Sequence, residues 1–126
     1  MDGESSVRHI LKKVGDMLST EKRQDYGHVY ASFSHIADLW SLYLKYTGRI
    51  PYDDEDLKPK DVAMLMVLFK IAREEHKHKE DNLLDIIGYA TLAQVIQETE
   101  DFIGSECDYG NISDEGELLQ EVENRG

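Results

Sequence analysis

The chain has 126 residues, of which 40% are hydrophobic and 32% charged, and its formal net charge is −12. This length suits one domain with its own core, and the composition excludes a wholly disordered protein. The longest apolar run, Val62–Phe69, is far shorter than the ~20 residues of a membrane span. The acidic start lacks the apolar stretch of a secretory signal, and a single cysteine, Cys107, suits a reducing compartment. We therefore expect a cytoplasmic protein.

Acidic residues gather toward the C-terminus. Residues 105–126 carry seven of them against Arg125 alone, which is half of the net charge. We expect residues 1–104 to form a helical domain and residues 105–126 to form an acidic, partly flexible tail. An acidic surface repels nucleic-acid backbones, so direct binding of duplex DNA is not expected. Mimicry of DNA by this acidic surface is a weaker alternative.

Helical periodicity runs through the chain. Apolar residues at i, i+3 and i+4 spacing predict helices over residues 5–19, 28–46 and 81–103. Another helix is predicted to begin at Pro59, which suits a first helical position, and to end at a turn near Lys77. Residues 47–58, with Gly48, Pro51 and four consecutive acids, indicate a loop. Four helices with short connections predict an all-α, four-helix bundle.

The helix that begins at Pro59 contains "VAMLMVLF", which is apolar on every side. Such a helix lies either in the centre of a fold or in a subunit interface. We therefore expect a homo-oligomer, a dimer or a tetramer, built on this helix. In the following helix, Gly88 indicates the close approach of a neighbouring helix or a ligand.

Charged residues flank the turn near Lys77. In an antiparallel pair of helices, Arg73 lies opposite Asp81, and Lys70 lies opposite Asp85. One interpretation is purely structural: ordinary ion pairs, with Asp81 as the N-cap of its helix.

The other interpretation is a ligand site. Asp81, Asn82 and Asp85 offer the oxygen ligands that Mg²⁺ prefers, while Lys70 and Arg73 can neutralise a phosphate. The two histidines of "EEHKHKED", His76 and His78, are instead interpreted as part of a solvated turn.

Two stretches carry a resemblance to a known family: "EKRQDYGHVYASFSHIADLWSLYL" and "PKDVAMLMVLFKIAREEHKHKEDNLLDIIGYATL". They resemble a small phage and prophage family with the ordered motifs R-x-x-D-Y-G-H, F-x-x-I-A-x-x-W, D-V-A-x-x-M, K-x-x-R, D-N-x-x-D and G-Y-A. That family is similar, at a distance, to the MazG-like all-α nucleoside triphosphate pyrophosphatases. Those enzymes bind Mg²⁺ through helical carboxylate pairs, cleave between the α and β phosphates, and form dimers or tetramers.

The resemblance implies that Asp81, Asn82 and Asp85 bind Mg²⁺, because they match the second acidic motif of the superfamily. The chain departs from the first motif, E-E-x-x-E, because its third helix offers Lys70 and Arg73 there. This replacement suits the binding of an anionic nucleotide better than its hydrolysis.

The remaining nucleotide contacts implied by the resemblance come from two places. Arg23, Tyr26 and His28 lie on the turn before the second helix, and Tyr89 lies one turn beyond the acidic motif. No catalytic residue is assigned.

Two functions follow. The first is a MazG-like (d)NTP pyrophosphatase or nucleotide binder, with Mg²⁺ as cofactor and a nucleotide or nucleotide-derived molecule as ligand. The alternative is a non-catalytic phage protein in the host cytoplasm, which sequesters a nucleotide signal or blocks a component of host defence.

Overall fold

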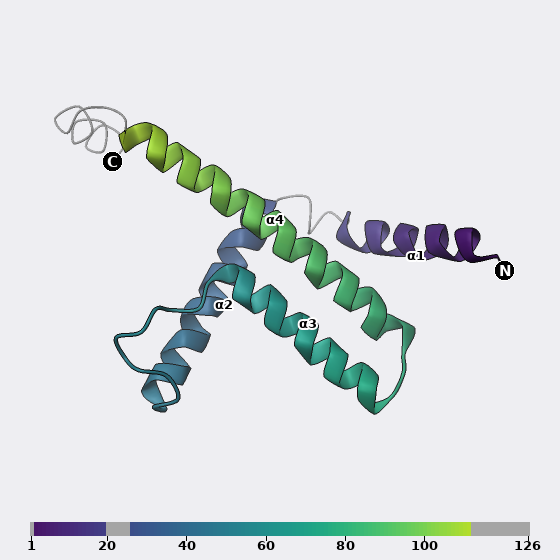
Figure 1. Cartoon of the computed structure of the whole chain (residues 1–126), viewed down its shortest axis with the longest axis horizontal. Coiled ribbons are helices and arrows are strands. Elements are labelled where there is room, and N and C mark those ends of the chain that lie inside the picture. The colour runs from purple at the N-terminus through teal and green to yellow at the C-terminus, as the bar shows by residue number, and fades with distance from the viewer. Residues whose placement is uncertain (1, 20–25, 112–126) are drawn as a thin grey trace. The chain divides into compact units, whose positions relative to one another are not determined.

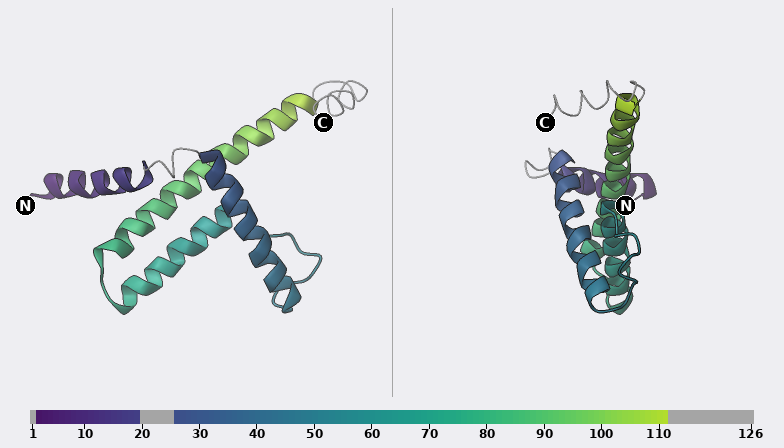
Figure 2. Two further views of the ribbon diagram at one scale, coloured as in Figure 1. Left: turned by 180° about the vertical axis from the view of Figure 1, so that it is seen from behind. Right: turned by 90° about the vertical axis from the view of Figure 1, so that its left-hand side faces the viewer.

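The computed structural model describes residues 2–19 and 26–111, with side chains described for 2–19 and 28–105. This part of the chain is all-helical and contains no strand, as predicted. Its elements are α1 (Gly3–Leu18), α2 (Tyr26–Tyr46), α3 (Pro59–His76) and α4 (Glu80–Asn111). The helices α3 and α4 run antiparallel as a hairpin, and α2 crosses it (Figure 1). The view from behind shows the same crossing (Figure 2).

Local signals account for most helix ends. The Asp2 side chain caps α1 by accepting the N–H of Ser5 at 2.7 Å. After α2, Gly48 adopts a φ of 75°, the left-handed conformation in which glycine commonly ends a helix. The helix α3 begins at Pro59 as predicted, and Asp61 in its first turn accepts the Lys58 N–H at 2.8 Å.

The helix α4 ends at Asn111, beyond the predicted end at residue 103. The helix continues through Gly104, the next residue, because an interior glycine costs only ~1 kcal/mol and keeps the N–H that proline lacks. Contacts divide the chain into two compact units, residues 1–96 and 97–126. The boundary predicted at residue 104 therefore falls within the second unit.

One apolar core cluster draws on all four helices. It comprises Val14 and Leu18 of α1, Val29 of α2, Ala63 of α3, and Leu92, Ala93 and Ile96 of α4. Only the end of α1 contributes to the cluster. Earlier in this helix, the apolar residues Val7 and Leu11 are more than half exposed. The described helices thus share a core without burying every predicted stripe, and none of them is long and apolar enough to cross a membrane.

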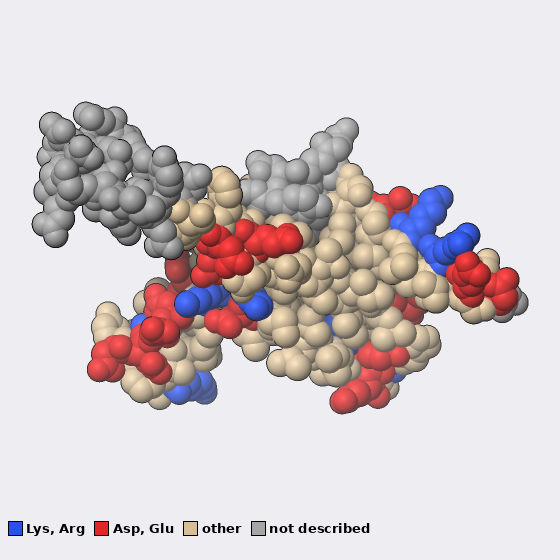
Figure 3. All heavy atoms as spheres, turned by 45° about the horizontal axis from the view of Figure 1, so that its top comes forward, with Lys and Arg blue, Asp and Glu red and all other residues tan. Residues whose placement is uncertain are grey.

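The helix α3 presents its small side chains inward and its large ones outward. Only Val62 and Ala63 are buried, whereas four large aliphatic residues on the opposite side are 38–59% exposed: Met64, Leu65, Leu68 and Ile71. Figure 3 shows one face of the molecule, on which a broad area without charged side chains separates the charged groups. Large hydrophobic side chains are exposed on all four described helices, so apolar surface of the described part stays in contact with water.

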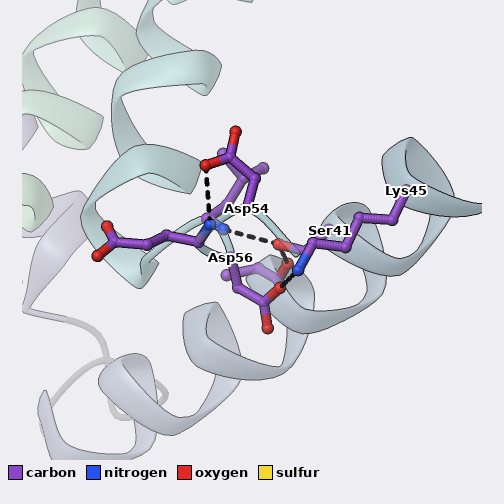
Figure 4. Close-up of polar contacts among 7 residues, drawn as sticks. Ser41, Lys45, Asp54 and Asp56 are labelled. Atoms are coloured by element: carbon purple, nitrogen blue, oxygen red, sulfur yellow. Dashed lines mark hydrogen bonds and ion pairs between the residues drawn. The ribbon is translucent and has the colours of Figure 1, made fainter. Parts of the chain in front are cut away.

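A buried serine fastens the loop before α3 to α2 (Figure 4). Ser41 is fully buried; its hydroxyl donates to the Ala37 carbonyl and accepts the N–H of Leu57, both at 2.7 Å. Close by, Lys45 forms an ion pair with Asp56 at 2.6 Å. These contacts place the acidic loop beside α2 and orient the start of α3.

We predict that Ser41→Ala lowers the free energy of unfolding by ~1–3 kcal/mol, because the Leu57 N–H loses its acceptor. Ser34→Ala is the matched control, since Ser34 makes the same bond to a preceding carbonyl, that of Tyr30. Urea unfolding monitored by circular dichroism should show a clearly smaller loss for Ser34→Ala. Equal losses in the two variants would refute the anchoring role of Ser41.

Candidate functional site

The α3–α4 turn is closed by one carboxylate, that of Glu74. One of its oxygens pairs with the ring of His78, and the other accepts the Lys79 N–H at 3.1 Å and the Asn82 amide at 3.3 Å. The hydrogen bond from His78, followed by that from the Lys79 N–H, holds the pKa of Glu74 below its ordinary value of 4.5. A residue in the last turn of α3 thus binds the first turn of α4.

Asn82 takes part in this closure. Its side chain is buried, and its amide also donates to the carbonyl of Lys77 at 3.4 Å. Both amide hydrogens are thereby directed at the turn. The structure gives Asn82, predicted as a metal ligand, a structural role at this position.

One of the two predicted facing pairs forms. Lys70 and Asp85 make an ion pair at 2.9 Å, with side chains 20% and 28% exposed. Arg73 and Asp81 form no ion pair in the described structure. The guanidinium of Arg73 instead lies 5.8 Å from the ring centre of Phe69. Glu74, the next residue along α3, makes the link to α4 that we expected Arg73 to make.

An open pocket of about 480 Å³ lies at this end of the hairpin. Its polar lining is dominated by basic side chains from the end of α3 and from the turn; the lining residues are Ala72, Arg73, His76, Lys77, Lys79 and Asn82. Two of the neighbouring acids have partners: Glu74 closes the turn, and Glu80 pairs with Lys13 at 2.8 Å, which lowers the pKa of Glu80. The lining of the pocket itself contains no acidic residue. The pocket therefore offers basic groups to a ligand.

A second, smaller cavity of about 50 Å³ is lined by Asp85, Gly88 and Tyr89 of α4 and by the end of α1. Gly88 leaves room for a side chain of α1, because a Cβ there would lie 2.8 Å from the methyl carbon at the flexible end of Met17. This confirms the close approach predicted from Gly88. Tyr89 packs against the core cluster beside this cavity and does not line the basic pocket.

The turn before α2 held the other predicted nucleotide contacts. Arg23 lies outside the described residues, and Tyr26 begins α2 without a described side chain. His28 is exposed in the first turn of α2. The structure thus brings together Lys70 and Asp85, and it places Arg73 in the basic pocket beside Asn82.

Several residues of the site were missed from the sequence. Glu74 was noted only as an acid at the end of a helix, and His76, Lys77 and Lys79 were interpreted as a solvated turn. An available signal was the i, i+4 spacing of Glu74 and His78, which brings the two together across the end of a helix. In the described part of the chain, no group of three or more His, Cys, Asp or Glu side chains could hold a metal ion.

We predict that Glu74→Gln destabilises the fold at neutral pH, because the neutral amide cannot replace the charged carboxylate. The folded pKa of Glu74 is lowered, so its contribution is present above pH 4.5 and is lost as the pH falls through the folded pKa. The gap in melting temperature between wild type and variant should therefore narrow below pH 4.5. Glu75→Gln, an exposed neighbour, is the control; an equal effect there would contradict the prediction.

Comparison with known proteins places the chain among phage sequences. "Gene 55 protein" of Mycobacterium phage L5 is 33% identical over 93 residues, covering 73% of this chain and 54% of that protein. "Gene 55 protein" of Mycobacterium phage D29 is 33% identical over 90 residues, covering 71% and 54%. The chain thus spans about half the length of these relatives, and no solved structure matches it.

A family model matches residues 9–97, which include the core cluster and the whole α3–α4 turn. The match confirms, at the level of the family, the phage resemblance predicted from the motifs. The chain belongs to the family described as "Domain of unknown function (DUF6378)".

Proposed function

We propose that this protein binds a phosphate-bearing nucleotide in the basic pocket at the α3–α4 turn. The observation that carries the proposal is the pocket itself, about 480 Å³ in volume and lined by Arg73, Lys77 and Lys79. Small-molecule sites typically enclose ~300–1,000 Å³, so a nucleotide is of suitable size. In a chain of net charge −12, such a pocket is a local exception that suits an anion.

Arg73 is best placed for the phosphate. Its guanidinium lies 5.8 Å from the centre of the Phe69 ring, and this planar group carries five N–H donors. Such donors match the oxygens of a phosphate in a two-pronged, charge-assisted contact. Lys77 and Lys79 add charge at the turn, next to the N-terminus of α4, whose dipole also favours an anion.

The pocket lining contains no Phe, Tyr or Trp, and the imidazole of His76 is its one ring. Tyr89 lines the separate small cavity. Recognition therefore depends on the phosphates more than on the base. We expect affinity to rise from mono- to di- to triphosphate, with little preference among the four bases.

The residues predicted to hold Mg²⁺ have other contacts in this structure. Asp85 is paired with Lys70, and Asn82 donates from its amide nitrogen to Glu74 and to the Lys77 carbonyl, whereas an ion would need its amide oxygen. Asp85 would have to leave Lys70 before it could join Asp81 as an oxygen ligand. The proposed binding of a nucleotide does not require a metal. The experiment below therefore measures nucleotide binding both with and without Mg²⁺.

Binding without hydrolysis is the form of the function that we favour. The resemblance to MazG-like pyrophosphatases supports a nucleotide ligand, but Lys70 and Arg73 stand where those enzymes carry carboxylates. The relatives are phage proteins, which supports action inside an infected host cell. A phage protein that holds a nucleotide without cleaving it would sequester a nucleotide signal of host defence.

The test is a titration of the full chain with nucleoside mono-, di- and triphosphates, with and without Mg²⁺, followed by chromatography of the ligand. Intact ligand recovered from the complex supports binding alone, whereas cleavage between the α and β phosphates supports a pyrophosphatase. No binding of any nucleotide would refute the proposal.

We predict that Arg73→Met weakens triphosphate binding by ~1.5–3 kcal/mol, because a charge-assisted contact to phosphate is lost. Arg49→Met, an exposed arginine in the loop after α2, is the matched control and should bind as wild type does. Isothermal titration calorimetry measures both, with melting curves to check folding. Equal affinities for Arg73→Met and wild type would remove Arg73 from the site.

A further inference from the structure

The outward face of α3 carries a regular apolar seam. The seam consists of Met64, Leu68 and Ile71, which follow one another at intervals of four and then three residues. The same alternation of three and four residues leads to Asp61 at one end and to Glu75 at the other. This is the heptad spacing by which one helix packs against another. All three apolar residues of the seam are exposed, at 47%, 59% and 38%.

The seam reverses the usual distribution of side chains. Three of the nine buried hydrophobic residues in the described part are alanines, whereas α3 leaves its large aliphatic residues outside. The exposed aliphatic side chains of α3 have no group that donates a hydrogen bond to water, whereas the exposed tyrosines of α2, Tyr43 and Tyr46, have a hydroxyl. Exposure of such a stripe is unfavourable for an isolated chain and favours a covering partner.

The area of the seam fits a second copy of the chain. Together with Leu65, the three residues expose on the order of 400 Å², comparable to the largest apolar patch of a typical monomer. This area is about half of the ~800 Å² per partner of a standard interface. An interface of this size suits a dimer that dissociates on dilution.

We propose that α3 is the interface of a homodimer, in which the seam of one copy packs against the same seam of the other about a two-fold axis. The axis brings apolar residues of the two copies together, and it also brings the acidic ends of the seam, Asp61 and Glu75, against acids of the other copy, a repulsion that salt screens. The inference does not rest on the proposed function. None of Met64, Leu68 and Ile71 lines the basic pocket, so nucleotide binding and dimerisation can be lost separately.

The experiment is sedimentation velocity on the full chain over a wide range of concentrations. Wild type should approach twice the chain mass of 14.5 kDa. Leu68→Glu should sediment as a monomer, since burial of unpaired charge should raise the concentration of half-dissociation by ~100-fold or more. Leu42→Glu is the matched control, because Leu42 on α2 is 60% exposed and Leu68 is 59% exposed.

Met64→Glu is a second seam variant in case Leu68→Glu does not fold, which circular dichroism checks. Added salt should strengthen the wild-type dimer, because it screens the repulsion between two chains of charge −12. Four outcomes would overturn the proposal: a wild-type monomer at every concentration, seam variants that remain dimeric, dissociation by Leu42→Glu to the same extent, or a dimer that salt weakens.

Discussion

The carboxylate of Glu74 holds together the two helices on which the site depends. It accepts hydrogen bonds from the Lys79 N–H and from Asn82, and it pairs with His78, so the last turn of α3 is joined to the first turn of α4. A turn of three residues between long helices would otherwise leave its polar groups to water. With the turn closed, the two helices have a definite register, and the Lys70–Asp85 pair lies deeper along the same hairpin.

The same closure determines which charges are available to a ligand. Three acids of the hairpin are paired within the chain: Glu74 with His78, Glu80 with Lys13, and Asp85 with Lys70. The basic residues that remain, including Arg73 and Lys79, line one pocket. Pairing of these three acids within the chain reduces their competition with an anionic ligand, which supports the proposed site.

The helix α3 serves two separate surfaces. Its C-terminal turns supply the basic pocket, and its middle turns present the apolar seam on the opposite side from Val62 and Ala63. A helix that is apolar on every side has no single preferred inward face, so one side can enter the core while another is left for a partner. The proposed assembly and the proposed ligand binding thus use different side chains of one element.

Local signals in the sequence determined the helical class and the start of α3 at Pro59, because each depends on spacing or capping within a short stretch. Spacing also predicted two facing ion pairs across the hairpin, and the tertiary structure decided that Lys70–Asp85 forms and Arg73–Asp81 does not. Only the tertiary structure decided the roles of Glu74 and Lys79. Polar residues in a turn carry no periodicity, and their partners depend on how two helices meet. Packing likewise decided which side of α3 faces the core. The stretch "VAMLMVLF" is apolar in every direction, so its sequence does not select a side. In the structure, the side that carries Val62 and Ala63 is buried.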